Sequence, residues 1–162
     1  MYKQGHIEKA EASQYAHPIV CVKMRGTDQI RLCCDLRAIN SITISDECPM
    51  ADLTELIDTA GGARYVSTID LKSGYHQIKM VEESKHFTGF RSFRRHWVWK
   101  KMCFDLKNAS KTFQRLMDKV LRGAEKYANS QQDDIIITSD TWSEHKMHIR
   151  DVFFCSVCVI QT

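Results

Sequence analysis

The stretch QQDDIIITS, residues 131–139, restricts what this chain can form more than any other feature of the sequence. Three isoleucines and a threonine make residues 134–139 strongly strand-prone, so we expect a strand there. Asp133 and Asp134 stand at its start, although adjacent carboxylates repel each other and neither suits a strand interior. Two interpretations follow: the pair forms a solvated turn before a buried strand, or the strand holds the pair against a cation.

A third carboxylate, Asp70, ends another strand-like segment, residues 63–71. A sheet presents side chains at strand ends on a fixed backbone, so Asp70, Asp133 and Asp134 are candidates for one cluster. Such a cluster is tolerated when a cation neutralises it, and Mg²⁺ or Mn²⁺ suits carboxylate oxygens. Two such ions, about 3.5–4 Å apart, activate a hydroxyl and stabilise a leaving oxygen in phosphoryl transfer. Spacing alone leaves both the turn and the metal site open.

The remaining sequence alternates loosely between strand and helix patterns. Strand-like runs joined by turn residues predict two hairpins, within residues 17–37 and 86–104. The clearest helix spans residues 108–124, and shorter helical patterns cover 50–62 and 141–154. The apolar stripe of the clearest helix consists of Phe113, Leu116, Met117, Val120 and Leu121. Together these patterns predict an α+β fold, with helices packed on one face of a sheet.

Length and charge narrow the class of protein. At 162 residues the chain is long enough for one domain with a real core and too short for two comfortable ones. Its net charge of +3 is compatible with a nucleic-acid partner. The segment FRSFRRHWVWKK, residues 90–101, suits either a nucleic-acid strand or a solvated hairpin face. No segment has the length of a membrane span or the core of a signal peptide, so we expect no membrane partner and an intracellular location, cytoplasmic or nuclear.

Histidine and cysteine pairs near the C-terminus raise a separate hypothesis. His145-x-x-His148 precedes Cys155-x-x-Cys158, and these side chains suit zinc. The competing interpretation is that two histidines three residues apart lie on a solvated helix face. Seven cysteines at irregular spacing argue against a disulfide framework, so we predict reduced cysteines in the core. A small zinc-binding interaction module is therefore a third hypothesis for function.

Seven motifs, in chain order, resemble those of reverse transcriptases from gypsy-type long-terminal-repeat retrotransposons and their retroviral relatives. The resemblance covers about residues 5–152 and includes QQDDIIITS, where the family has Tyr-x-Asp-Asp followed by a strand. The other six are SQYAHPIVCVK (13–23), RLCCDLRAINSIT (31–43), GGARYVSTIDLKSGYHQIKM (61–80), FTGFRS (87–92), MCFDLKNASKTFQRLMDKVL (102–121) and SEHKMHI (143–149).

The resemblance implies a polymerase palm, an antiparallel sheet packed on helices, together with a fingers subdomain and no thumb. It implies one reverse transcriptase-like domain over residues 1–162, family-like in 5–152 and divergent in 153–162. The implied function is RNA-directed DNA polymerase, a nucleotidyltransferase within a retrotransposon Pol polyprotein. Its partners would be an RNA/DNA template–primer and deoxynucleoside triphosphates. Other Pol segments, namely the thumb, RNase H and integrase, are missing from these residues.

Site residues follow from the resemblance by position. The family's catalytic metal ligands fall on Asp70, Asp133 and Asp134, which would hold two Mg²⁺ or Mn²⁺ ions. Its nucleotide-binding positions fall on Lys23, Arg31, Leu71, Tyr75 and Phe104. The two basic residues match fingers positions that contact phosphates. The tyrosine matches the aromatic that excludes a ribose 2′-hydroxyl, and the phenylalanine matches a pocket-lining residue, although both also suit a plain core.

Several departures from the family pattern lie close to these positions. Gln131 and Gln132 replace an aromatic and an aliphatic residue before the aspartate pair, and the segment YANSQQ is a poor strand former. Asp105 stands where the family has a glycine, the residue that adopts a positive φ most readily, and it adds a negative charge. The chain thus resembles a truncated, partly degenerate copy. The alternative function is an inactive retroelement remnant that at most binds nucleic acid.

Overall fold

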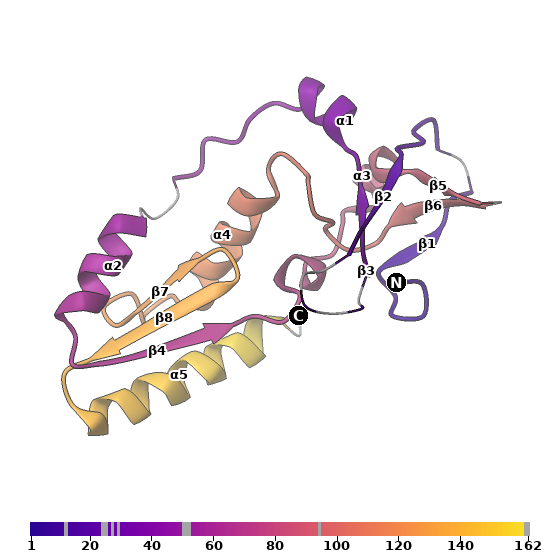
Figure 1. The fold of residues 1–162 in the computed structure, drawn as a ribbon. Coiled ribbons are helices and arrows are strands. Elements are labelled where there is room, and N and C mark those ends of the chain that lie inside the picture. The colour runs from indigo at the N-terminus through magenta and orange to yellow at the C-terminus, as the bar shows by residue number, and fades with distance from the viewer. Residues whose placement is uncertain are drawn as a thin grey trace. The chain divides into compact units, whose positions relative to one another are not determined.

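The computed structural model describes residues 1–11, 13–23, 26, 28, 30–49, 53–93 and 95–160. The chain folds into two compact units. The first unit consists of Met1–Ser45 and Tyr75–Ala109, and the second of Asp46–Gly74 and Ser110–Thr162. Their helices and strands are labelled in Figure 1. Within the part of the chain that the structure describes, no helix is long and apolar enough to cross a membrane.

The described residues of the first unit form two antiparallel sheets. One has the strand order β1-β6-β5 and the other pairs β2 with β3. The two predicted hairpins are both present, as β2–β3 and β5–β6. The strands are β1 (Ile7–Lys9), β2 (Ile19–Lys23), β3 (Ile30–Cys34), β5 (Phe90–Ser92) and β6 (Arg95–Trp99). The α-helices are α1 (Arg37–Ile42) and α3 (Glu82–Lys85). Two 3-10 helices accompany them: η1 (Gly74–Gln77), whose first residue belongs to the second unit, and η2 (His86–Thr88).

An apolar cluster forms the core of the first unit, and two cysteines belong to it. Its buried members are Ile7, Cys34, Leu36, Ile39, Phe90, Trp99 and Cys103. The indole nitrogen of Trp99 donates a hydrogen bond to Cys34 Sγ at 3.3 Å. Burial raises the pKa of both thiols, which keeps them neutral. These two cysteines are reduced core residues as predicted, whereas Cys21 is exposed.

The second unit is built on one antiparallel sheet of order β4-β8-β7. Its strands are β4 (Tyr65–Asp70), β7 (Ala128–Gln131) and β8 (Asp134–Ser139). Its helices are α2 (Leu53–Gly62), α4 (Ala109–Val120) and α5 (Trp142–Ile160). Strand β8 has the bounds predicted from its sequence. Strand β7 forms despite its weak propensity, and α5 runs well past residue 154, where the helical pattern was expected to end.

The pairing register gives this sheet two faces of different character. Residues on adjacent strands that lie directly opposite each other point to the same side. One side, here named the helix face, includes the fully buried Ile135 and Ile137. Its residues are Tyr65, Ser67, Ile69, Ala128, Ser130, Ile135, Ile137 and Ser139. The other side, named the carboxylate face, consists of Val66, Thr68, Asp70, Asn129, Gln131, Asp134, Ile136 and Thr138.

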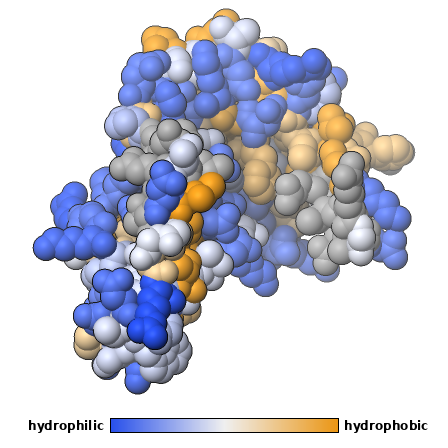
Figure 2. Space-filling view, turned by 60° about the vertical axis from the view of Figure 1, so that its left-hand side comes forward, coloured by the Kyte–Doolittle hydropathy of each residue, from blue (hydrophilic) through white to orange (hydrophobic). Residues whose placement is uncertain are grey.

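Helices α4 and α5 both reach the helix face. From α4, Gln114 Nε2 donates a hydrogen bond to Ser130 Oγ at 3.4 Å. From α5, His145 lies 2.8 Å from Ser67 Oγ. The apolar stripe predicted for α4 is confirmed, with Phe113 and Met117 buried. On the surface shown in Figure 2, hydrophilic side chains predominate and hydrophobic residues form separate patches between them.

Candidate active site

The register of three strands places polar side chains in one row on the carboxylate face. Asp70 of β4 is the register partner of Asp134 of β8, which is in turn the partner of Gln131 of β7. Directly opposite residues in antiparallel strands have Cβ atoms about 4.5–5.5 Å apart. Both aspartates are exposed to solvent. Two like charges therefore lie side by side at the end of the sheet, with an amide beside them.

Asp133 lies in the tight turn that joins β7 to β8. Because Gln131 pairs with Asp134, the loop contains two residues, Gln132 and Asp133. Gln132 has φ of 53°, a conformation for which hairpin turns usually select glycine. The carbonyl of Asp133 accepts a hydrogen bond from Leu71 N at 2.9 Å, which ties the turn to the residue after Asp70. All three predicted carboxylates therefore gather at one end of the sheet.

The side chain of Asp133 is closely packed against its surroundings. A Cβ atom placed on Gly74 would lie 2.7 Å from Asp133 Oδ1 and 2.8 Å from Cζ of Phe113. Both distances are shorter than carbon contacts allow, so only glycine fits at position 74 without a shift of its neighbours. Sequence analysis did not single out this glycine, although it lies within the SGYHQ motif next to Tyr75. Gly74 thus leaves the room that the Asp133 side chain occupies.

The carboxylate oxygens at the end of the sheet have the chemistry that a divalent cation such as Mg²⁺ requires. Oxygen ligands from Asp70 and Asp134, adjacent on two strands, suit Mg²⁺ or Mn²⁺ in chemistry and placement. Asp133 Oδ1 packs against Gly74 rather than toward a shared centre. Across the described ranges, no three acidic, histidine or cysteine side chains converge as a ready-made metal site. The chemistry of Asp70 and Asp134 therefore fits a divalent cation, which these two residues would hold.

The predicted phosphate-binding residues lie in the β2–β3 hairpin of the first unit. Lys23 ends β2, and its side chain is 71% exposed and forms an ion pair of 3.0 Å with Asp28. An exposed pair of this kind contributes little energy, so the ammonium group is available to a stronger anion. Arg31 lies in β3 opposite Val22, and its side chain falls outside the described residues.

The rings of Tyr75 and Phe104 contact each other. Their ring centroids are 5.6 Å apart at an interplanar angle of 75°, an edge-to-face contact. Phe104 also meets His76 edge-to-face at 5.0 Å, and His76 stacks on Trp99 at 5.4 Å. His76 is buried, and its Nδ1 lies 3.0 Å from the carbonyl oxygen of Met102. Sequence analysis missed His76, which packs between the rings of Phe104 and Trp99.

The departure at Asp105 has the backbone consequence expected from the sequence. Its φ is 71°, in the left-handed region that glycine adopts freely. Aspartate is among the few other residues that visit this region, because its short polar side chain bonds locally. Here Asp105 Oδ2 accepts a hydrogen bond from Leu36 N at 3.4 Å, and its carbonyl accepts one from Asn40 Nδ2 at 2.6 Å. These bonds offset part of the strain.

The predicted zinc ligands have other partners. His145 is buried, with Nε2 at 2.8 Å from Ser67 Oγ and Nδ1 at 3.0 Å from Ser139 Oγ. His148 Nδ1 lies 2.7 Å from the same Ser139 hydroxyl. The side chain of Cys158 lies outside the described residues. Both histidines therefore fasten α5 to the sheet, and neither the solvated helix face nor the zinc module describes their role.

Residues 16–156 match the family described as "Reverse transcriptase (RNA-dependent DNA polymerase)". The chain belongs to the reverse transcriptase family. It is 38% identical over 158 residues to the retrovirus-related Pol polyprotein from transposon 297 of Drosophila melanogaster, covering 94% of this chain and 15% of the relative. Its identity to the Pol polyprotein from transposon gypsy of the same organism is 36%, covering 97% and 16%. This reverse transcriptase domain thus spans less than a fifth of the length of these relatives.

Solved structures show the same fold. A foamy viral protease–reverse transcriptase in complex with double-stranded DNA superposes with a TM-score of 0.88 at 23% identity, covering 98% of this chain and 27% of that one. The same viral enzyme in complex with an RNA/DNA hybrid gives 0.86 at 24% identity, covering 96% and 21%. The predicted α+β architecture of palm and fingers is therefore confirmed for this reverse transcriptase domain.

Proposed function

We propose that this reverse transcriptase domain catalyses RNA-directed DNA synthesis by two-metal nucleotidyl transfer at Asp70, Asp133 and Asp134. The observation that carries the proposal is the register that sets Asp70 opposite Asp134, beside the turn that contains Asp133. Like charges placed directly opposite destabilise a sheet, so their pairing at an exposed strand end is a cost to the fold. A bound divalent cation removes that cost.

In the proposed reaction the primer 3′-oxygen bonds to the α-phosphorus of a deoxynucleoside triphosphate, and the bond from that phosphorus to the β-phosphate oxygen breaks. Two bound Mg²⁺ or Mn²⁺ ions would favour the deprotonated primer hydroxyl and stabilise the leaving pyrophosphate. Asp70 and Asp134 supply ligands from a rigid pair of strands. The hydrogen bond from Leu71 to the turn keeps Asp133 next to them.

The nucleotide would be selected by residues of the first unit. Lys23 and Arg31 are proposed to contact its phosphates, and the ring of Tyr75, held by Phe104, to exclude a ribose 2′-hydroxyl. From the second unit, Leu71 is proposed to contribute its backbone next to Asp70. The template–primer would be an RNA/DNA or DNA duplex, the kind of ligand named for the foamy viral enzyme. Thumb, RNase H and integrase segments of a Pol polyprotein would be further partners.

A primer-extension assay with an RNA template and Mg²⁺ tests this proposal. The change Asp133→Asn should reduce incorporation at least about 100-fold, since it weakens the hold on the cations that would stabilise the transition state. Asp140→Asn is the matched control, because Asp140 is exposed and follows the opposite end of β8. It should retain full activity. Incorporation by Asp133→Asn at the rate of the unsubstituted chain contradicts the assignment.

A second candidate function is nucleic-acid binding without catalysis. The backbone conformation of Gln132 favours it, because this non-glycine residue occupies a positive φ in the turn that contains Asp133. An amide from Gln131 also lies in the row of carboxylates. Binding of a template–primer that weakens steeply with salt, without any incorporation, would support this candidate over the enzyme.

A further inference from the structure

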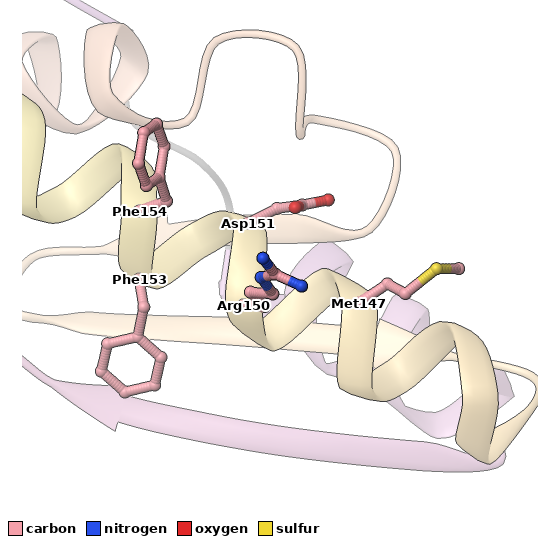
Figure 3. Close-up of a pocket in the computed structure, with 5 residues that line it drawn as sticks. All are labelled: Met147, Arg150, Asp151, Phe153 and Phe154. Atoms are coloured by element: carbon pink, nitrogen blue, oxygen red, sulfur yellow. The ribbon is translucent and has the colours of Figure 1, made fainter.

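The outward side of α5 carries large apolar side chains in solvent. Met147 is 56% exposed, Phe153 53% and Phe154 73%. Together with Arg150 and Asp151 they line a shallow pocket, and all five residues come from this one helix (Figure 3). The opposite side of α5 is held to the sheet by the buried His145 and Val152. An apolar surface of this kind on an anchored helix indicates an interaction site.

Four of these residues form one stripe along the helix. With 3.6 residues per turn, Met147, Arg150, Asp151 and Phe154 fall within an arc of about 100°. Phe153 flanks this stripe, and Figure 3 shows it leaving the helix in a different direction from Phe154. The buried His145 and Val152 fall on the other side of the helix by the same spacing. The stripe is therefore a continuous surface, with apolar ends and a charged middle.

The order of residues in the stripe is self-complementary. Met147 and Phe154 lie equally far along the helix from the centre of the Arg150–Asp151 pair. When two copies of α5 pack antiparallel about a two-fold axis through that centre, each Met147 meets the partner's Phe154. Each Arg150 then meets the partner's Asp151. Such an isologous arrangement is the commonest symmetry of homo-oligomers.

We propose that this chain forms a two-fold symmetric dimer through the outward stripe of α5. The stripe holds one cation and one anion, so it lacks the excess of positive charge that a nucleic-acid strand requires. Its charges pair with a second copy in antiparallel orientation only. In the isolated chain Asp151 Oδ2 accepts a 3.5 Å hydrogen bond from Tyr127, which leaves the carboxylate available to a stronger partner. The contact is small, so the dimer dissociates on dilution.

Sedimentation equilibrium of the full chain over a wide concentration range tests the proposal. The apparent mass should rise from 18.8 kDa toward twice that value as concentration increases. Arg150→Asp places carboxylates against carboxylates and should keep the chain monomeric. Combining Arg150→Asp with Asp151→Arg exchanges the two charges and should restore the dimer. Arg122→Asp makes the same charge change at an exposed residue outside α5 and should leave the dimer intact.

Phe154→Glu provides a second variant with an independent effect. It replaces an exposed side chain, so folding should be retained, as circular dichroism would verify. Its carboxylate would face the partner's Met147, and the dimer should be lost. A mass of 18.8 kDa at every concentration overturns the proposal. A dimer that persists in both Arg150→Asp and Phe154→Glu also overturns it, because association then uses another surface. The assay needs neither nucleotide nor metal, so its outcome is separate from that of the proposed catalytic function.

Discussion

The two faces of the β4-β8-β7 sheet differ in burial and in charge. The helix face buries Ile135 and Ile137 completely and satisfies its polar groups through α4 and α5. The carboxylate face sets Asp70 against Asp134 and leaves both in solvent. Stability therefore comes from one side of these strands, whereas the other side holds charges that oppose folding. The two carboxylates contribute nothing to packing, and their repulsion is the cost that the proposed cation would remove.

Polar residues on the helix face also differ in kind from those on the carboxylate face. Ser139 Oγ contacts a ring nitrogen of both His145 and His148. His148 stacks on Tyr127 with ring centroids 3.7 Å apart and an interplanar angle of 6°. Buried polar groups that are fully paired fix the position of the elements that carry them. This network sets how α5 lies on the sheet, and so which side of α5 faces outward.

The largest expected effect is on the helix face. Ile137→Ala should lower the free energy of unfolding by about 2–5 kcal/mol, because it leaves a cavity in a site with no solvent exposure. Ile136→Ala, one residue along the strand on the half-buried carboxylate face, is the matched control and should cost clearly less. Urea denaturation of both variants measures the difference. Equal losses would show that the two faces are packed alike and would remove the contrast.

A smaller loss of stability is expected at the turn that contains Asp133, beside the carboxylate face. Gly74→Ala places a Cβ against Asp133 Oδ1 and Phe113, and overpacking of this kind costs about 1–3 kcal/mol. The control is Gly61→Ala in α2, where an added Cβ meets no atom within 4 Å. Alanine is the better helix former, so this control should be neutral or raise stability by up to about 1 kcal/mol. Thermal unfolding compares the two, and a neutral Gly74→Ala would mean that the Asp133 side chain moves freely.

The sequence predicts local features of the two faces better than long-range ones. The bounds of β8 and the stripe of α4 follow from propensity and periodicity within a few residues of chain. The pairing of Asp70 with Asp134 joins residues more than sixty positions apart. Their places at strand ends made them candidates for one cluster and the family resemblance supported it, but neither predicted the register. The packing of Asp133 against Gly74 has no sequence signal of its own, because it depends on where η1 begins after β4.

Helix α5 shows the same limit most clearly. Its histidines, expected on a solvated face or at a metal, face inward because Ser67, 78 residues away in the sequence, offers a hydroxyl to His145. Trp142, which by its apolar character belongs with Ile149 and Val152, is instead 55% exposed. By residue type, tryptophan is expected to be more buried than histidine, and α5 has the reverse: His145 is buried by its hydrogen bonds, whereas Trp142 is exposed. The outward stripe of α5 could therefore not be identified before the structure.

The smallest expected effect has the opposite sign and lies on the carboxylate face. Asp134→Asn removes the repulsion from Asp70, so in the absence of metal the variant should be more stable by about 0.2–1 kcal/mol. Saturating Mg²⁺ should raise the melting temperature of the unsubstituted chain, because a ligand that binds only the folded state stabilises it. The variant should gain less, and Asp140→Asn should match the unsubstituted chain in both conditions. A variant that loses stability without metal would mean that Asp134 supports the fold, and the contrast between the two faces would then fail at this residue.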